Sequence, residues 1–445
     1  MGCKTIPLNR ARETVVVIGG GIAGVAAART LHDAGYEVSL IEARNRLGGR
    51  IHTDRSLGTA IELGASRIHG ASRNPITMLA RQHGVRLEKV VWENLSGYES
   101  DGTPLDKRYL GDIYDKVYGT LVRAFLKSLG GAEDRPVEEV IQKERNDRNA
   151  TPVERRMFEF GLSNFEILFG APLSDLSFEG GKEYDEYRGG DHFVVNGLDT
   201  VPRQLAVGLN ISTGKVVQSI EHGRSHIRIH TDDGTIQADR VIITVPLGVL
   251  KANRIKFDPE LPDEKRDAIA QLGMGHINKI ALKFPRPFWP KEDFAIARTT
   301  SVRGEYTTFV NAYHFTNEPI LVGQIPSSYR NGLENVPDDQ IFAEAVGVLR
   351  RMYGSNVPDY TDAVRTRWAA DPFALGAQSY NKFGVESGPL RDVLAQPIDD
   401  RLFFAGEATN RKRYGSVSGA YNSGLRAAEE LMNLRPADTS APETS

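Results

Sequence analysis

The chain has 445 residues, of which 40% are hydrophobic and 25% are charged, and this composition is that of a soluble globular protein. Its length indicates two domains, or one nucleotide-binding domain with a large insertion. Its net charge of -3 gives no electrostatic reason to expect nucleic acid or an anionic membrane as a partner, and no apolar run reaches the length of a membrane span. The single cysteine, Cys3, excludes intramolecular disulfides and cysteine metal sites, so we predict no metal centre and a reducing, cytoplasmic location.

The chain begins with the pattern of a nucleotide-binding βαβ unit. Residues 15–18 are a continuous apolar run, as in a buried parallel strand. The glycine pattern Gly19-x-Gly21-x-x-Gly24 follows and leads into an alanine-rich helix that we expect to end near residue 34. A second apolar strand, 37–41, ends at Glu42. The glycines therefore lie at the turn from strand to helix, where such a motif binds a dinucleotide.

Each residue of this turn has a physical task. Gly19 permits the tight turn, Gly21 lets a pyrophosphate approach backbone N–H groups, and Gly24 lets the helix pack closely on the strand. The helix N-terminus adds positive partial charge. Glu42 comes at the end of the second strand, where a carboxylate accepts hydrogen bonds from ribose hydroxyls.

The middle of the chain predicts two kinds of structure. Residues 96–188 are rich in charge and carry apolar residues at helical spacing, which indicates an inserted helical subdomain. Residues 214–250 then read as a strand meander with a turn at "DDG", followed by a buried strand at 241–245. A further strand covers 276–284 and places Lys279 on the face opposite Ile280.

The end of the chain returns to cofactor-type motifs. The stretch "RLFFAGEATNRKRYGSVSGAYNSGLRAA" reads as a strand, a glycine-rich loop and a helix that opens near Val417. Because such motifs occur at both ends, we expect a nucleotide-binding domain assembled from distant segments.

Six ordered motifs together resemble the flavin-containing amine oxidase superfamily, which includes monoamine and polyamine oxidases, L-amino acid oxidases and flavin-type lysine demethylases. They are "VVVIGGGIAGVAAARTL", "EARNRLGGRIHT", "ELGASRIHGASRNPI", "DRVIITVPLGVLK", "NKIALKFPRPFW" and the C-terminal stretch above. The motifs are closest to those of polyamine oxidases. No long helical-tower insertion is visible, which argues against a chromatin-linked demethylase.

The resemblance implies an α/β fold. It consists of a Rossmann-type FAD-binding domain of the glutathione-reductase-like type and a mixed-sheet substrate domain with an inserted helical subdomain. We expect the FAD-binding domain to span residues 14–95, 196–255 and 396–435. The substrate domain would then span 96–195, which includes the helical insertion, and 256–395. Residues 1–13 and 436–445 are expected to be flexible tails.

The resemblance also implies the residues that bind FAD. It places Val217 by the adenine, Glu407 near the ribityl chain and pyrophosphate, and Ser416 at the flavin ring. Monoamine oxidases attach the flavin to a cysteine, but Ala377 takes that place here, so we predict non-covalent FAD. The predicted cofactor-binding residues are Gly19, Gly21, Ile22, Ala23, Gly24, Glu42, Ala43, Arg44, Gly49, Arg50, Gly64, Ala65, Ser66, Arg67, Val217, Gly406, Glu407, Ser416, Val417 and Ala420.

Three predicted catalytic residues follow from the same resemblance. Lys279 matches the family lysine that holds a water near flavin N5, where a cation also favours oxygen activation. Glu166 matches an acid in the substrate tunnel of polyamine oxidases, and Tyr380 flanks the expected flavin face. Gln378 and Ser416 stand where monoamine oxidases have two aromatic rings, which argues against a simple monoamine substrate.

Two further candidates, Arg67 and His69, point to different substrates. His69 matches the histidine of a "GASWIHG"-like segment in polyamine oxidases. Arg67 replaces the tryptophan of that segment and resembles the arginine of L-amino acid oxidases, where a guanidinium pairs with the substrate carboxylate. Arg67 could equally be structural, through its backbone or through bonds to carbonyl groups.

The sequence therefore predicts an FAD-dependent oxidase that moves a hydride from the C–H beside an amine nitrogen to flavin N5. The products would be an imine or iminium and, after reoxidation by O2, hydrogen peroxide. The predicted substrate is a polyamine or secondary amine. The alternatives are an amino acid bound by Arg67, a C–N bond of a specialised metabolite, or a non-enzymatic protein that resembles GDP-dissociation inhibitors. The oligomeric state stays open.

Overall fold

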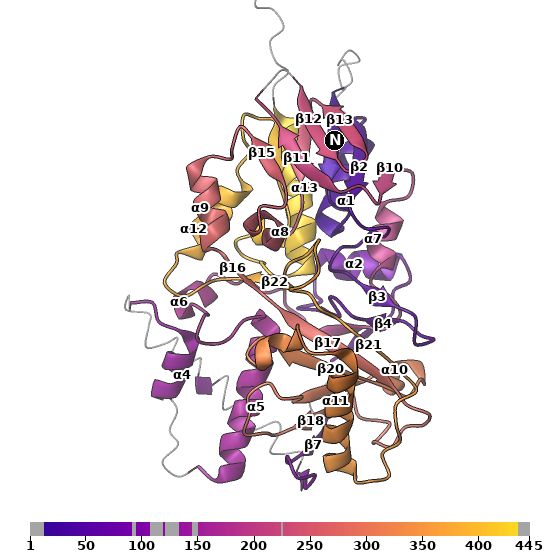
Figure 1. Ribbon diagram of the computed structural model, residues 1–445. Helices are drawn as coiled ribbons and strands as arrows, with labels where there is room; N and C mark the ends of the chain where they lie inside the picture. The colour runs from indigo at the N-terminus through magenta and orange to yellow at the C-terminus, as the bar shows by residue number, and fades with distance from the viewer. Residues whose placement is uncertain are drawn as a thin grey trace, which may run out of the picture.

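The computed structural model describes residues 13–90, 95–106, 119–120, 133–144, 150–223 and 226–434. Except for residue 13, both predicted tails lie outside these residues. Figure 1 shows one group of elements around α1 and α13 and a second group around β17, β20 and α11. Both groups contain sheets and helices, which confirms the predicted α/β class.

A parallel sheet of five strands forms the centre of the first group. The valine and isoleucine residues of its central strands β1 and β14 are buried, as in sheets that are covered on both faces. Its strands come from distant parts of the chain. In spatial order they are β10 (Asn210–Thr213), β2 (Glu37–Glu42), β1 (Thr14–Ile18), β14 (Arg240–Ile243) and β23 (Leu402–Phe404).

Helices α1 (Ile22–Asp33) and α13 (Val417–Asn433) lie side by side on this sheet, so the start and the end of the described chain meet (Figure 1). Small residues permit the close approach. A Cβ at Gly24 would lie 1.9 Å from the Gly19 carbonyl oxygen, and one at Gly424 would lie 2.1 Å from that of Ala23. The predicted βαβ unit and the predicted start of the last helix at Val417 are confirmed.

The predicted meander forms a sheet of four strands in the order β13-β12-β11-β15. β11 (Val217–Glu221), β12 (Ile227–Thr231) and β13 (Gly234–Ala238) are antiparallel, with the "DDG" turn between the last two. β15 (Lys256–Asp258) adds in parallel to β11.

A sheet of seven strands forms the second group. The long helix α11 (Asp338–Tyr353) buries its apolar side against the core of this group, which includes Ile280, Leu282 and Phe284. In spatial order the strands are β21 (Asp362–Arg365), β17 (Ile277–Lys283), β20 (Ile320–Pro326), β19 (Thr308–Asn311), β18 (Ala295–Arg298), β7 (Leu95–Tyr98) and β8 (Pro104–Leu105).

Helix α5 (Pro152–Phe169) is the longest described element of the predicted helical insertion. Thr151 and Glu154 form a capping box at its N-terminus, and Gly170 ends it in the left-handed conformation. α4 (Val137–Glu144) and α6 (Phe178–Gly181) also fall in this region. Residues 107–118, 121–132 and 145–149 of the predicted insertion lie outside the described part.

Shorter elements connect these bodies. They are β3 (Thr53–Asp54), β4 (Ile61–Glu62), β5 (Arg67–Ile68), α2 (Pro75–Gln82), β6 (Leu87–Lys89), β9 (His192–Val194), α7 (Thr200–Leu205), α8 (Leu247–Lys251), α9 (Asp263–Gln271), β16 (Gly273–Gly275), α10 (Tyr313–Thr316), η1 (Arg330–Leu333), β22 (Gln378–Tyr380), α12 (Ser387–Ala395) and η2 (Glu407–Thr409). None of the helices in the described ranges combines the length and apolarity needed to cross a membrane.

Candidate functional site

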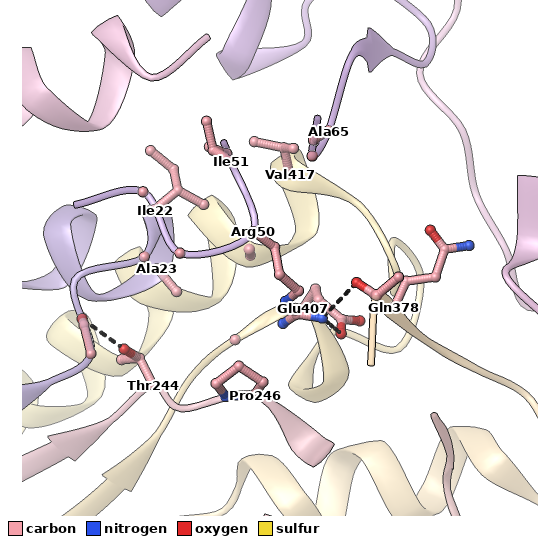
Figure 2. Close-up of a pocket in the computed structure, with 18 of the residues that line it drawn as sticks. Ile22, Ala23, Arg50, Ile51, Ala65, Thr244, Pro246, Gln378, Glu407 and Val417 are labelled. Carbon is pink, nitrogen blue, oxygen red and sulfur yellow. Dashed lines mark hydrogen bonds and ion pairs between the residues drawn. The ribbon is translucent and has the colours of Figure 1, made fainter. Parts of the chain in front are cut away.

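A cavity of about 490 Å³ lies where β1 and β2 end, and its size is that of a cofactor site. Lining residues come from the glycine turn, from the 48–51 and 64–69 segments, from β11, β17 and β22, and from the start of α13. Figure 2 shows Ile22, Ile51, Ala65, Gln378 and Val417 of this lining. Of the predicted cofactor-binding residues, all line this cavity except Gly24, which instead packs α1 against the turn.

The turn after β1 presents backbone to the cavity. Gly19 has φ +108°, and a Cβ built on Gly21 would meet no atom within 4 Å. The 48–51 loop docks on this turn, because the Gly48 N–H donates to the Gly20 carbonyl at 2.8 Å. Thr244, which the sequence did not reveal as a site residue, secures the turn by donating to the carbonyls of Ile18 and Gly19 at 2.9 and 3.0 Å.

Glu42 is buried beside this turn. Its Oε2 accepts from the Gly20 N–H at 2.6 Å, and its Oε1 accepts from the Arg44 N–H at 2.8 Å. A carboxylate has about four lone-pair directions, so Glu42 can accept further hydrogen bonds beside these two. Arg44 is held by Asp371 at 2.7 Å.

Buried Glu407 and half-buried Arg50 form an ion pair of 2.8 Å in the cavity wall (Figure 2). Glu407 also accepts from Ser379 Oγ at 2.6 Å and from the Gly415 N–H at 2.7 Å. Burial alone would raise the pKa of Glu407, but Arg50 and Arg391 outweigh it and hold the pKa below its ordinary value. The carboxylate is therefore charged and fixed at neutral pH.

These features fit FAD. The open space at Gly21 and the start of α1 suit a pyrophosphate, and Arg50 supplies positive charge beside it. Ser416 caps α13 by accepting from the Gly419 N–H at 3.0 Å, so the positive end of this helix also faces the cavity lining. The donor set and the small residues are those that a dinucleotide requires.

Lys279 projects from β17 into the lining and is only 7% exposed. Its Nζ donates to the carbonyls of Glu62 and Gly64 at 3.0 and 2.7 Å and to Ser66 Oγ at 2.9 Å. Three acceptors thus use the three protons of the ammonium. Burial lowers the pKa of Lys279 to about 7, against the opposing charge of Glu62.

Glu62 is the buried acid behind this lysine. Its carboxylate accepts from the Leu198 N–H at 2.8 Å and from Thr53 Oγ1 at 2.9 Å. Burial raises the pKa of Glu62 to about 7. The sequence motif "ELGAS" did not single out this carboxylate, because nothing local reveals that it faces a lysine far along the chain.

Arg67 and His69 both line the cavity. β5 pairs with β9, with Arg67 opposite Phe193, and this pairing fixes the direction of both side chains. His69 Nδ1 lies 3.0 Å from Asp191 Oδ2. The positive charge of Arg67 also acts on Asp191.

The structure does not place Glu166 in the cavity. Glu166 is 1% exposed, receives hydrogen bonds from Ser328 and from the Leu173 N–H at 3.3 Å, and lies 3.7 Å from Arg303. The reason is the rotation of α5 about its axis. The two following residues, Ile167 and Leu168, face the cavity, and Glu166 does not. The expected role in a substrate tunnel therefore has no geometric support.

Tyr380 is likewise outside the lining, although Gln378 of the same strand is in it. A Cβ on Gly273 would lie 2.5 Å from the Tyr380 ring, so the ring packs against β16. Burial raises the pKa of Tyr380 to about 12. The ring is a core residue behind the site.

Further aromatic, charged and polar residues that sequence reasoning missed also line the cavity. They come from the 184–187 segment, from β20, from the loop before β22 and from the loop before α13. Apart from Arg413, which lies inside the C-terminal motif, none of them belongs to a motif that the sequence analysis identified. They are Tyr184, Asp185, Tyr187, Gln324, Trp368, Phe373 and Arg413.

Comparison with known proteins agrees with this geometry. A family model described as flavin containing amine oxidoreductase matches residues 22–432. Lysine-specific histone demethylase 1 homolog 2 of Arabidopsis thaliana is 37% identical over 96% of this chain and 60% of its own length. Polyamine oxidase 5 of Oryza sativa subsp. japonica is 34% identical over 95% of this chain and 88% of its own. Probable polyamine oxidase 4 of Arabidopsis thaliana is also 34% identical, over 95% and 88%.

The chain spans between 52% and 60% of the length of three lysine-specific histone demethylase homologues that it matches. The polyamine oxidases match over most of both chains. The match to the family model covers most of this chain as well, and the cavity fits the cofactor that this family carries, which is FAD. The protein belongs to the flavin-containing amine oxidoreductase family.

Proposed function

We propose that the protein is an FAD-dependent oxidase of polyamines or other secondary amines. The observation that carries the proposal is that one cavity joins the residues of a dinucleotide cradle to Lys279 and to His69, which has carboxylates behind it. Carboxylates at this end favour a cationic substrate. The names and coverage of the polyamine oxidase relatives support the same substrate class.

Bound FAD supplies the acceptor for a hydride from the carbon beside the amine nitrogen. The residues of the chain orient the amine, exclude water and remove a proton from the bound ammonium. We further propose that O2 is the final acceptor and that hydrogen peroxide is released. We also propose that FAD is held without a covalent bond, because Ala377, which lines the cavity, stands where the resemblance to monoamine oxidases would place their cysteine.

The domain assignment follows from the same proposal. Segments 14–95, 196–255 and 396–435 would bind FAD, and segments 96–195 and 256–395 would close the cavity over the substrate. Lining residues such as Tyr184 and Trp368 come from the latter two segments.

An amine that carries a carboxylate is the second candidate, because Arg67 lines the cavity. The negative charge of Asp191 near Arg67 already compensates the guanidinium in part, which weakens its pull on a substrate carboxylate. We therefore place polyamines and secondary amines first.

Two measurements test the proposal. Purified protein should be yellow, and acid precipitation should release the flavin into the supernatant; a colourless preparation that does not bind added FAD would overturn the oxidase assignment. Peroxide release should then be compared for polyamines, amino acids, N-acyl amines and an N-methyl-lysine peptide. Fastest turnover of amino acids, lost in Arg67→Ala, would replace our substrate class with the second candidate.

A further inference from the structure

Asp191 is a largely buried carboxylate that the proposed function has not yet used. Its Oδ2 lies 3.0 Å from His69 Nδ1, and its Oδ1 accepts from the Gly70 N–H at 3.3 Å. Its own carbonyl accepts from the Val90 N–H at 2.9 Å. Both carboxylate oxygens and the backbone are therefore fixed, and one oxygen is directed at the imidazole.

The His69 backbone is fixed as firmly. Asn74 Nδ2 donates to the carbonyls of His69 and Gly70 at 3.1 and 3.2 Å. Gly70 has φ +61°, and a Cβ there would lie 1.6 Å from the Tyr187 carbonyl oxygen, so only glycine fits this crossing. The imidazole thus lines the cavity in one orientation, and no protein partner for its Nε2 is present among the described residues.

The charged groups around the imidazole differ in their protonation. Burial opposes ionisation of Asp191, but His69 and Arg67 outweigh it and hold the pKa of Asp191 below its ordinary value. Glu186 lies 3.8 Å from His69 Nδ1, and burial raises its pKa. Tyr184 faces the two carboxylates, and its pKa is raised by burial. Of these two carboxyl groups, Asp191 is therefore the one that more readily stays ionised beside His69.

We propose that Asp191 and His69 form a dyad in which Asp191 accepts a hydrogen bond from the Nδ1–H of His69, so that the lone pair of Nε2 is the base for the substrate ammonium. In this step an N–H bond of the ammonium breaks, an Nε2–H bond forms, and the nitrogen keeps its electron pair. Asp191 stabilises the imidazolium that results. Asp191 is a positioning residue, and His69 is the group that touches the substrate.

The inference rests on the proposed function, since alkyl amines are protonated at neutral pH and must lose a proton before they donate a hydride. A test by NMR does not depend on that function. The chain has ten histidines, so the imidazole signal that disappears in His69→Ala identifies His69. In the wild-type holoenzyme, neutral His69 should be the Nδ1–H tautomer; the Nε2–H tautomer would overturn the dyad.

The chemical shift of the same imidazole signal should change when Asp191→Asn removes the charge that the Nδ1–H faces. Glu88→Gln is the matched control, because Glu88 is an exposed carboxylate on β6, which pairs with the same strand β9. The control should leave the signal in place. An unchanged signal in Asp191→Asn would also contradict the dyad.

Anaerobic reduction of the bound flavin by a polyamine gives the kinetic arm. Asp191→Asn should slow reduction by about tenfold or more and move the acidic limb of its pH profile to lower pH. In a His69→Ala background the same change should add no further loss, because the partner of Asp191 is already gone. Fully additive losses would show that Asp191 acts elsewhere. If wild-type flavin is not reduced by any amine while the NMR results hold, the proposed function fails and the dyad stands.

Discussion

Lys279 is the residue whose chemistry depends most on its neighbours, and its replacement gives the first prediction. We propose that Lys279 lies near flavin N5, and Lys279→Met removes this cation from the cavity lining. Reoxidation of reduced enzyme by O2 should then slow by about tenfold to 100-fold, with a smaller effect on reduction. Stopped-flow absorbance measures both steps. Lys283→Met is the control, because Lys283 lies on the same face of β17 and binds Leu57 and Glu318 outside the cavity lining. Equal slowing in both variants would deny Lys279 a specific role.

Glu62 gives the second prediction at this scale. Its negative charge raises the pKa of Lys279, against the larger effect of burial. Glu62→Gln removes that charge, so the pKa of Lys279 should fall further below about 7 and the ammonium should lose its proton at lower pH. The alkaline limb of the reoxidation rate should therefore move to lower pH. A limb that stays in place would mean that another group controls it.

At the scale of an element, two glycines at the turn between β1 and α1 have different roles, because Gly24 is needed for packing and Gly21 leaves space for the cofactor. Gly24→Ala would force a Cβ to 1.9 Å from the Gly19 carbonyl, so it should destabilise the apoprotein by several degrees in Tm or prevent folding. Gly21→Ala meets no protein atom, so apoprotein stability should stay near that of the wild type, while FAD affinity falls because the methyl group occupies pyrophosphate space. Thermal unfolding and FAD titration of both apoproteins measure the two effects. Equal FAD affinity in Gly21→Ala and the wild type would place the pyrophosphate elsewhere.

The sequence predicted the elements that depend on local motifs better than those that depend on distant contacts. The βαβ unit and the cofactor-lining residues come from local motifs, where apolar runs, glycines and a strand-end acid lie close together in the chain. The helical phase that turns Glu166 toward Arg303, and the packing of the Tyr380 ring against Gly273, depend on partners more than 100 residues away. The 184–191 segment crosses residues 69–72 without any motif of its own, so the pairing of Asp191 with His69 was visible only in the fold.

For the whole molecule, the cavity is built from segments near both ends of the chain, with α1 against α13, so cofactor binding should stabilise the protein as one unit. A ligand that binds only the folded state adds about 2.7 kcal/mol at 100 times its Kd. The Tm of apoprotein should therefore rise steadily with the logarithm of FAD concentration. In limited proteolysis, FAD should protect sites near residue 50 and sites near residue 410 in parallel, because Arg50 and Glu407 pair across the same wall. Protection of one region alone would show that the other segment does not belong to the cofactor site.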